Sequence, residues 1–292
     1  MMKRILSFLL VLVLASSCAV GRYARGPESD QIVSLPGYDG IIEAVTYDCS
    51  EPNLSKRRMV VYLPADYYVD SLRHYPVMYL LHGARGNEVT WIERGDAFRS
   101  LDSLRQNNLA TDFILVLPNL NNYTGDKDYK NGHALNAMRA FWLLDGEAER
   151  YFFQDIVSRV DSLYRTVPEK EARAIAGMSS GALQSIYISA GHPDAFGYVG
   201  LFSPYNHPTF AAMCHRDVYG KLWKRLENQF ADQPVQYTVY IGNTDFFYPH
   251  MRIYHKNLMK KEYPHRFVIT PGGHEWYNWS YFLIDFYKRI FR

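Results

Sequence analysis

A serine between two glycines stands where the chain changes from a strand pattern to a helix pattern. Ser179 is the centre of residues 177–181, which read G-x-S-x-G, after the short apolar run 172–176 and before a helical pattern that ends at Gly191. A sharp turn of this kind lifts a hydroxyl above the edge of a sheet, and the glycines remove side chains that would collide there. We therefore predict that Ser179 is a nucleophile. The alternative is a tight Gly/Ser turn without chemistry.

A serine hydroxyl is a weak nucleophile, so it needs a neighbouring base and a carboxylate that orients the base. Of the seven histidines after Ser179, only His274 stands in a glycine-rich segment just past an apolar strand pattern. Asp245 similarly follows the apolar run 235–241. The expected chain order is Ser, then Asp, then His, so we predict His274 as the base and Asp245 as the acid. Glu275 is the main rival acid, but its adjacency to His274 gives it an unfavourable geometry.

Attack of a serine on a carbonyl carbon creates an oxyanion, which backbone N–H groups can stabilise. One donor is expected at Ser180, the residue after the nucleophile. The other is expected in the glycine-rich loop after the apolar run 77–81. We assign this donor to the backbone of Ala84, with Gly83 as the alternative.

The elements that must position these residues alternate along the chain. Residues 41–47 and 58–63 have the alternating character of an antiparallel pair, and six apolar runs are typical of buried strands. Those runs are residues 77–81, 113–117, 172–176, 198–202, 235–241 and 266–270. Helical spacing joins Phe152, Ile156, Val160 and Leu163, then Val218, Leu222, Leu226 and Phe230, and finally Phe282, Phe286 and Ile290. This order predicts an α/β fold with a mostly parallel central sheet and helices on both faces. Ligand sites in such sheets lie beyond the carboxyl ends of the strands.

Composition and charge exclude several classes of protein. The 292 residues include 32 Lys plus Arg and 30 Asp plus Glu, and two of the basic residues, Lys3 and Arg4, fall in the leader. A balanced charge argues against nucleic acid or an anionic membrane surface as the main partner. No H-E-x-x-H motif, cysteine cluster or dinucleotide fingerprint occurs. We therefore expect neither a metal nor a cofactor.

The first residues are typical of an exported bacterial lipoprotein. Residues 1–17 combine a basic start with a short apolar run and predict a signal peptide. Small residues before Cys18 resemble a lipobox, which predicts lipidation of Cys18 and a membrane anchor there; the alternative is cleavage without a lipid. Residues 18–35 are expected to be a lipidated N-terminus and tether, and residues 36–292 a single domain. We expect the protein in the cell envelope, facing the periplasm or the cell surface.

Cys49 and Cys214 remain after Cys18. They are either a disulfide of that oxidising compartment or two buried thiols.

Several stretches together resemble the esterase D family of α/β-hydrolases, especially its feruloyl and acetylxylan esterase branch. They are residues 57–64, 75–83, 175–181, 192–196, 242–246 and 272–276. The resemblance implies the α/β-hydrolase fold and a serine carboxylesterase that acts on an acylated carbohydrate or a small ester. It also assigns the triad to Ser179, Asp245 and His274. The family often has Met where this chain has Ser180, a difference that leaves the backbone N–H in place.

Four aromatic residues in or near the loops of the expected active face are candidates for stacking on a sugar ring or an aromatic acyl group. They are Trp91, Trp142, Phe246 and Trp276. Two other functions remain open, a non-catalytic glycan-binding lipoprotein of the same fold and an acyltransferase. The intact Ser, Asp and His in the correct order argue against the first of these.

The base must be neutral to accept the serine proton, and an ordinary imidazole has a pKa of about 6.5. We therefore expect hydrolytic activity to fall below about pH 6.5. A pH–rate profile tests this expectation, and a rate that stays flat down to about pH 4 would contradict it.

Overall fold

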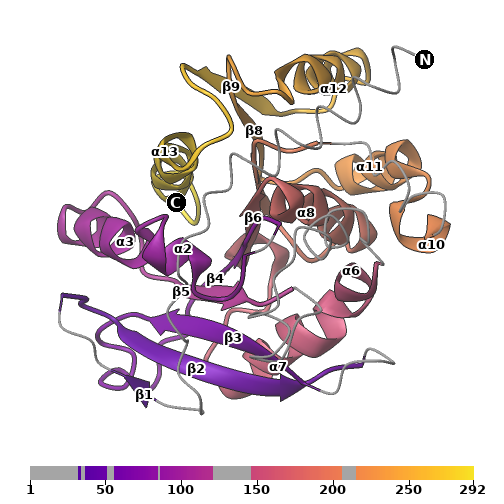
Figure 1. Cartoon of the computed structure of the whole chain (residues 1–292). Coiled ribbons are helices and arrows are strands. Elements are labelled where there is room, and N and C mark those ends of the chain that lie inside the picture. Colours follow the sequence, from indigo (N-terminus) through magenta and orange to yellow (C-terminus); the bar gives the residue numbers. More distant parts are fainter. Residues whose placement is uncertain (1–31, 34–36, 51–55, 85, 121–145, 206–214) are drawn as a thin grey trace, which may run out of the picture.

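The computed structural model describes residues 32–33, 37–50, 56–84, 86–120, 146–205 and 215–292. A nine-stranded sheet runs through the described molecule in the order β1-β2-β3-β5-β4-β6-β7-β8-β9 (Figure 1). β1, β2 and β3 pair antiparallel, β3 also pairs antiparallel with β5, and the six strands from β5 to β9 are parallel. The mostly parallel sheet predicted from the sequence is confirmed. The strands are β1 (Ile32–Val33), β2 (Ile41–Asp48), β3 (Lys56–Leu63), β4 (Val77–Leu81), β5 (Ile114–Pro118), β6 (Arg173–Met178), β7 (Tyr198–Phe202), β8 (Gln236–Gly242) and β9 (Arg266–Thr270).

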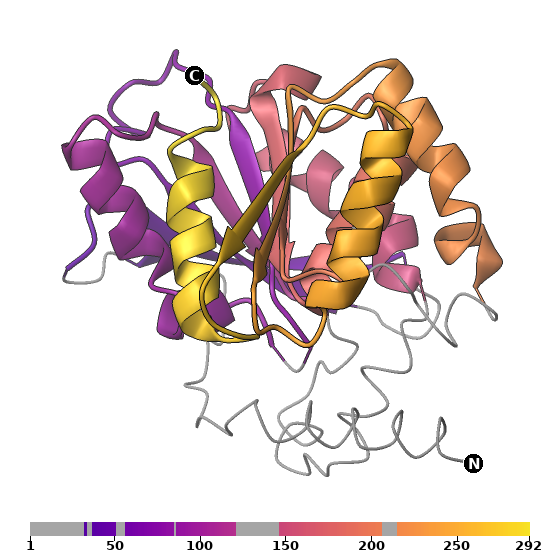
Figure 2. The same cartoon turned by 90° about the horizontal axis from the view of Figure 1, so that it is seen from above.

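Helices cover both faces of this sheet (Figures 1 and 2). One face carries α2 (Thr90–Glu93), α3 (Ala97–Gln106) and α13 (Trp276–Tyr287). The other face carries α6 (Glu147–Tyr151), a π-helical turn (Phe152–Val157), α7 (Ser158–Leu163), α8 (Ser180–Gly191), α10 (Arg216–Tyr219), α11 (Leu222–Ala231) and α12 (Tyr248–Lys260). α8 lies against the middle of the sheet and is buried along nearly its whole length.

The central strands are buried on both faces, which explains their continuous apolar sequences. Successive side chains of a strand point to opposite faces. Tyr79 and Leu81 of β4 therefore join the core under α8, whereas Met78 and Leu80 join the core under α3 and α13. These two apolar layers hold the carboxyl ends of the strands in fixed positions.

Two predicted helices differ in detail from the structure. Gly220 and Lys221 separate the expected helix 218–230 into α10 and α11, and Lys221 has a left-handed backbone with φ 55°. Leu163, expected on a buried face, is 43% exposed at the end of α7. The π-helical turn before α7 changes the helical phase, which the simple periodicity could not reveal.

The predicted signal peptide, residues 1–17, and Cys18 lie outside the described residues. Within the expected tether, 18–35, the structure describes Ile32–Val33, which pairs with β2 as the edge strand β1. In the part of the chain that is described, no helix is both long enough and apolar enough to cross a membrane.

Phe286 tests the core beneath α13. Its ring is fully buried and lies edge-on to Phe202 of β7, with 6.0 Å between ring centroids. Truncation of such a side chain leaves a cavity, so Phe286→Ala is expected to lower the free energy of unfolding by about 3–5 kcal/mol. Tyr281 on the same helix is 52% exposed, and Tyr281→Ala should change stability by less than about 0.5 kcal/mol. Urea unfolding of both variants provides the measurement, and equal losses would contradict this packing.

Candidate active site

Ser179 occupies the turn between β6 and α8. Its φ is 54° and its ψ is −115°, a strained backbone for a residue with a side chain. The turn is held because the N–H of Ser179 donates to the carbonyl of Phe202 at 2.9 Å, and the N–H groups of Ala182 and Leu183 donate to the Ser179 carbonyl. The predicted strand–turn–helix setting of the serine is therefore present in the structure.

The two glycines of this turn are required by close backbone contacts. A Cβ on Gly181 would lie 2.4 Å from the carbonyl oxygen of His82, and a Cβ on Gly177 would lie 2.6 Å from the backbone of Gly181. Neither distance leaves room for a methyl group. The contact also brings the loop after β4 directly against the start of α8.

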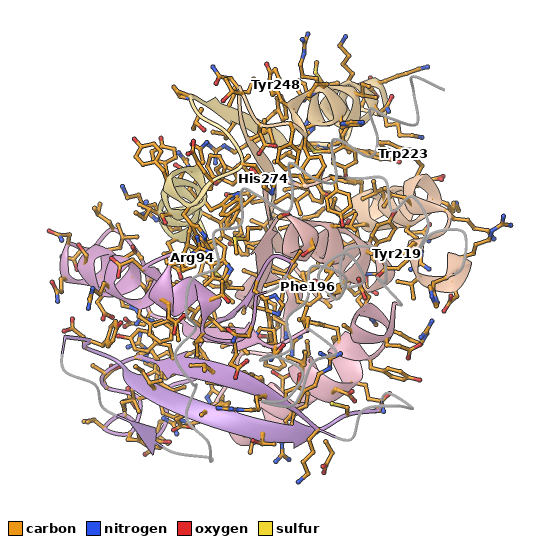
Figure 3. All side chains as sticks on the ribbon, in the orientation of Figure 1. Arg94, Phe196, Tyr219, Trp223, Tyr248 and His274 are labelled. Atoms are coloured by element: carbon orange, nitrogen blue, oxygen red, sulfur yellow. The ribbon has the colours of Figure 1, made fainter. Side chains whose placement is uncertain are left out.

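His274 connects Ser179 to Asp245. Its Nε2 lies 2.9 Å from the Ser179 hydroxyl oxygen, and its Nδ1 lies 2.9 Å from Oδ2 of Asp245. A carboxylate can only accept, so Nδ1 carries the proton and donates to it, while Nε2 accepts from the hydroxyl. Figure 3 shows His274 near the centre of the view, between β6 and β8. The structure thus brings together the three residues that the sequence predicts.

Asp245 is 3% exposed and is held in place by its second oxygen. The N–H of Phe247 donates to Oδ1 of Asp245 at 2.8 Å, which leaves Oδ2 directed at His274. The loops that carry the two residues also touch, because the N–H of Thr244 donates to the carbonyl of Gly272 at 3.0 Å. This contact fixes the position of Asp245 relative to His274.

Glu275, the rival candidate for the acid, does not contact His274 through a hydrogen bond among the described residues and has a structural role instead. Its Oε1 accepts a hydrogen bond from the N–H of Gly273 at 2.9 Å, so the side chain closes the turn around His274. The buried amide of Asn278 donates to the Gly273 carbonyl at 2.9 Å and supports the same turn. In this arrangement Asp245, and not Glu275, contacts the imidazole.

Aromatic rings surround the imidazole of His274. The centroids of Phe246, Trp279 and Phe247 lie 4.4, 4.9 and 5.3 Å from it. Phe246, a substrate-binding candidate, is half-buried and packs on the imidazole. Sequence reasoning missed Trp279, because the helical pattern is recognisable only from Phe282 onward, whereas α13 begins at Trp276 and places the rings of Trp276 and Trp279 5.2 Å apart.

The prediction that Trp91 contacts substrate is wrong. Its side chain is 1% exposed, and its indole Nε1 donates to the carbonyl of Leu81 at 2.9 Å, so it is a core residue without a face for substrate. Trp276 is half-buried instead, edge-on to Trp91, and the guanidinium of Arg94 lies 5.1 Å from its ring centre. Figure 3 shows Arg94 beside α2. Trp142 lies outside the described residues.

The oxyanion-hole candidates lie on both sides of the close contact between Gly181 and the carbonyl of His82. Ser180 begins α8, and Ala84 follows β4 in the loop that touches Gly181. Among the described residues, the backbone N–H groups of Ser180, Ala84 and Gly83 have no hydrogen-bond acceptor. The carbonyl of Gly83 accepts from Nδ1 of His82 at 2.8 Å. Because the C=O and N–H of a trans peptide point in opposite directions, the N–H of Ala84 points away from His82.

His82 is a buried histidine beside this loop, 3% exposed. Its Nε2 accepts from the N–H of Leu120 at 2.9 Å, so the ring proton is on Nδ1. Burial, assisted by the positive charge of Arg57, lowers the pKa of His82 from 6.5 to about 4. The imidazole is therefore neutral over the pH range in which serine hydrolases work.

Other titratable groups lie apart from the site. Within the described part of the chain, no cluster of three or more His, Cys, Asp or Glu side chains has the arrangement of a metal site. His255 and His265 contact each other at 2.8 Å, and His192 stacks on Phe153. Cys49 is half-buried against the core and Cys214 lies outside the described residues, so their pairing stays a prediction.

Gly181→Ala tests the close contact at the turn. The new methyl group would displace α8 from the loop after β4, and a shift of about 1 Å in a reacting group can cost about 100-fold in rate. We expect the hydrolytic activity of Gly181→Ala to fall by at least about that factor. Gly191→Ala, at the other end of α8, is the control, because its Cβ would meet only the Arg225 side chain at 3.4 Å. Equal activities of the two variants would contradict this role of the contact.

His82 also predicts a pH dependence of stability. Between about pH 6.5 and about 4 the unfolded chain binds a proton that the folded chain does not, so stability decreases as the pH falls through this window. The resulting loss in the free energy of unfolding reaches about 3 kcal/mol at the lower end of this pH window. Above about pH 6.5, His82 adds no pH dependence to stability. Urea unfolding at a series of pH values, compared with His82→Gln, measures it. The same pH slope in the variant would contradict the assignment.

One protein-family model matches most of this chain. The family described as "Putative esterase" matches residues 51–290. An endo-1,4-beta-xylanase/feruloyl esterase of Xylanibacter ruminicola is 31% identical over 167 residues, which cover 56% of this chain and 22% of that protein. The match thus spans less than a quarter of that relative's length.

Solved structures give the same fold. A ferulic acid esterase aligns with a TM-score of 0.68 and 26% identity, over 86% of this chain and 99% of the other. A ferulic acid esterase from the anaerobic fungus Anaeromyces mucronatus aligns with a TM-score of 0.65 and 22% identity, over 94% and 97% of the two chains. The α/β-hydrolase fold and the family resemblance predicted from the sequence are confirmed. The chain belongs to the "Putative esterase" family.

Proposed function

We propose that this protein is a serine carboxylesterase that removes acyl groups, feruloyl or acetyl, from carbohydrate through Ser179, His274 and Asp245. The observation that carries the proposal is the continuous hydrogen-bond chain from the Ser179 hydroxyl through His274 to the Asp245 carboxylate. The serine stands at the turn between β6 and α8, where its backbone is strained, and among the described residues the N–H groups of Ser180 and Ala84 have no hydrogen-bond acceptor. Membership of an esterase family supports the reaction class.

The first half of the reaction forms an acyl-enzyme. The oxygen of Ser179 attacks the ester carbonyl carbon while its proton passes to Nε2 of His274. Negative charge develops on the carbonyl oxygen, and the N–H groups of Ser180 and Ala84 would stabilise it. The tetrahedral intermediate then collapses, and His274 gives the proton to the leaving alcohol oxygen. The Asp245 carboxylate accepts the hydrogen bond from Nδ1 and stabilises the imidazolium.

The second half returns the enzyme to its starting state. A water molecule donates a proton to Nε2 of His274 and attacks the carbonyl carbon of the acyl-enzyme. The same N–H groups face the new oxyanion. Collapse releases the acid, and the proton on His274 returns to the Ser179 oxygen. No step needs a metal or a cofactor.

The proposed substrate class rests on similarity and on the ring cluster. A relative bears the name feruloyl esterase, and one solved neighbour is a ferulic acid esterase in complex with ferulic acid. In this chain Phe246 and Trp276 are half-buried aromatic residues near His274 and are suited to stacking on an aromatic acyl group or a sugar ring. Acetyl esters are the alternative substrate within the same proposal.

We also propose that the protein is exported and anchored in the bacterial envelope by a lipid on Cys18. Support comes from the basic and apolar residues 1–17 and from the small residues that precede Cys18. This location would place the enzyme beside polysaccharide that reaches the cell surface or the periplasm. Metabolic labelling with a fatty-acid analogue, with Cys18→Ser as control, tests the anchor.

Ser179→Ala provides the test of the esterase. Purified residues 19–292 are expected to hydrolyse methyl ferulate or 4-nitrophenyl acetate, and Ser179→Ala is expected to lower kcat by at least about 10⁴-fold because no other group supplies the nucleophile. Ser162→Ala is the matched control, since Ser162 is exposed on α7. The ratio of the two rates ranks feruloyl against acetyl groups. Turnover that survives in Ser179→Ala would mean that a different residue attacks the ester.

A further inference from the structure

His82 is a second histidine at the active face, and the proposed mechanism does not use it. It directly follows β4, and its carbonyl lies against Gly181 at the start of α8. Its ring is buried, yet both nitrogens have hydrogen-bond partners. A buried imidazole that makes two backbone hydrogen bonds beside the nucleophile is a strong constraint on the local backbone.

Only one form of the ring satisfies both partners. The N–H of Leu120 can only donate, so Nε2 must be unprotonated, and the carbonyl of Gly83 can only accept, so Nδ1 must carry the proton. The ring is therefore a neutral linker between the loop after β4 and the end of β5. A protonated ring would present an N–H to the N–H of Leu120 and lose that bond.

We infer that His82 is the positioning residue of the oxyanion hole, which it sets by fixing the peptide between Gly83 and Ala84. The inference rests on the proposed esterase function. The Gly83 carbonyl accepts from Nδ1 of His82 at 2.8 Å and also from the N–H of Gly86 at 3.0 Å. With the oxygen held by two donors, the N–H of Ala84 must point the opposite way. A flipped peptide would place a carbonyl oxygen where the hole needs a donor.

The second bond of the ring prevents it from rotating. Leu120 lies 38 residues away, just beyond β5. The His82 ring therefore links the Gly83 peptide, which follows β4, to the end of the neighbouring strand β5. Asn119 is fixed in turn, because its amide donates to Glu88 at 2.8 Å and its carbonyl accepts from Arg57 at 3.0 Å. Arg58, 3.6 Å from Glu88, completes the charged groups around this end of β5.

Two substitutions test the two hydrogen bonds of the His82 ring separately. An asparagine amide nitrogen reaches the position of Nδ1, whereas a glutamine amide reaches that of Nε2. His82→Asn thus retains a donor to the Gly83 carbonyl, and His82→Gln retains only an acceptor for Leu120. We expect kcat to fall by about 10- to 100-fold in His82→Gln, approaching the loss of a complete oxyanion donor, with KM within about 3-fold of the wild type. His82→Asn should retain kcat within about 5-fold.

The kcat and KM values of these variants test the positioning role of His82. A second measurement is the affinity of each variant for a boronic acid that forms a tetrahedral adduct with Ser179. His82→Gln should weaken this adduct by about the same factor as kcat, because both need the oxyanion donors. Equal losses in the two variants, or a loss confined to KM, would overturn the inference.

A measurement on the unaltered protein does not depend on whether the variants fold. Nitrogen-15 NMR of the histidine rings should show His82 protonated on Nδ1 alone and neutral at about pH 6, in agreement with burial that lowers its pKa to about 4. A ring protonated on Nε2 would overturn the inference even in an active esterase. Absence of ester hydrolysis in the wild type would instead refute the proposed function and leave the NMR result readable.

Discussion

The site depends on one backbone contact, the approach of the turn at Ser179 to the end of β4. Gly181 lies so close to the carbonyls of Leu81 and His82 that no Cβ fits between them. The contact fixes α8 against the sheet, so the serine backbone is held at a φ that it would not adopt freely. It also places the first N–H groups of α8 beside the loop after β4. The same packing therefore positions both the proposed nucleophile and the proposed oxyanion donors.

The other two residues of the site lie in loops that follow neighbouring strands. Asp245 follows β8 and His274 follows β9, and these strands pair in parallel register, so both loops emerge at the same edge of the sheet as Ser179. Apolar layers on both faces keep that edge rigid. Hydrogen bonds within the loops then complete the geometry, through Phe247 for the acid and through Glu275 and Asn278 for the base.

Sequence reasoning could predict the features that are local or follow chain order. The turn at Ser179 has its own pattern of strand, glycines and helix, and Asp245 and His274 come just after apolar strand patterns in the order that such a triad requires. The boundaries of the eight predicted strands agree with the structure to within two residues because strands of this sheet are short runs of apolar or alternating residues, whereas β1 falls in the expected tether. The sequence could not say which face a loop residue takes. The sequence therefore suggests Trp91 as a substrate contact although it is buried, and it gives no signal for Trp279, whose ring packs on His274. The role proposed for His82 depends on Leu120, whose position only the sheet order reveals.

The central claim is that Ser179 is activated by His274. Peptide mapping by mass spectrometry after reaction with a fluorophosphonate tests it most directly, because this reagent modifies serines that a neighbouring base has made nucleophilic. We predict one phosphonyl group per chain, on the peptide that contains Ser179, and none on that peptide in His274→Ala. Modification at another residue, or undiminished modification of Ser179 in His274→Ala, would contradict the claim.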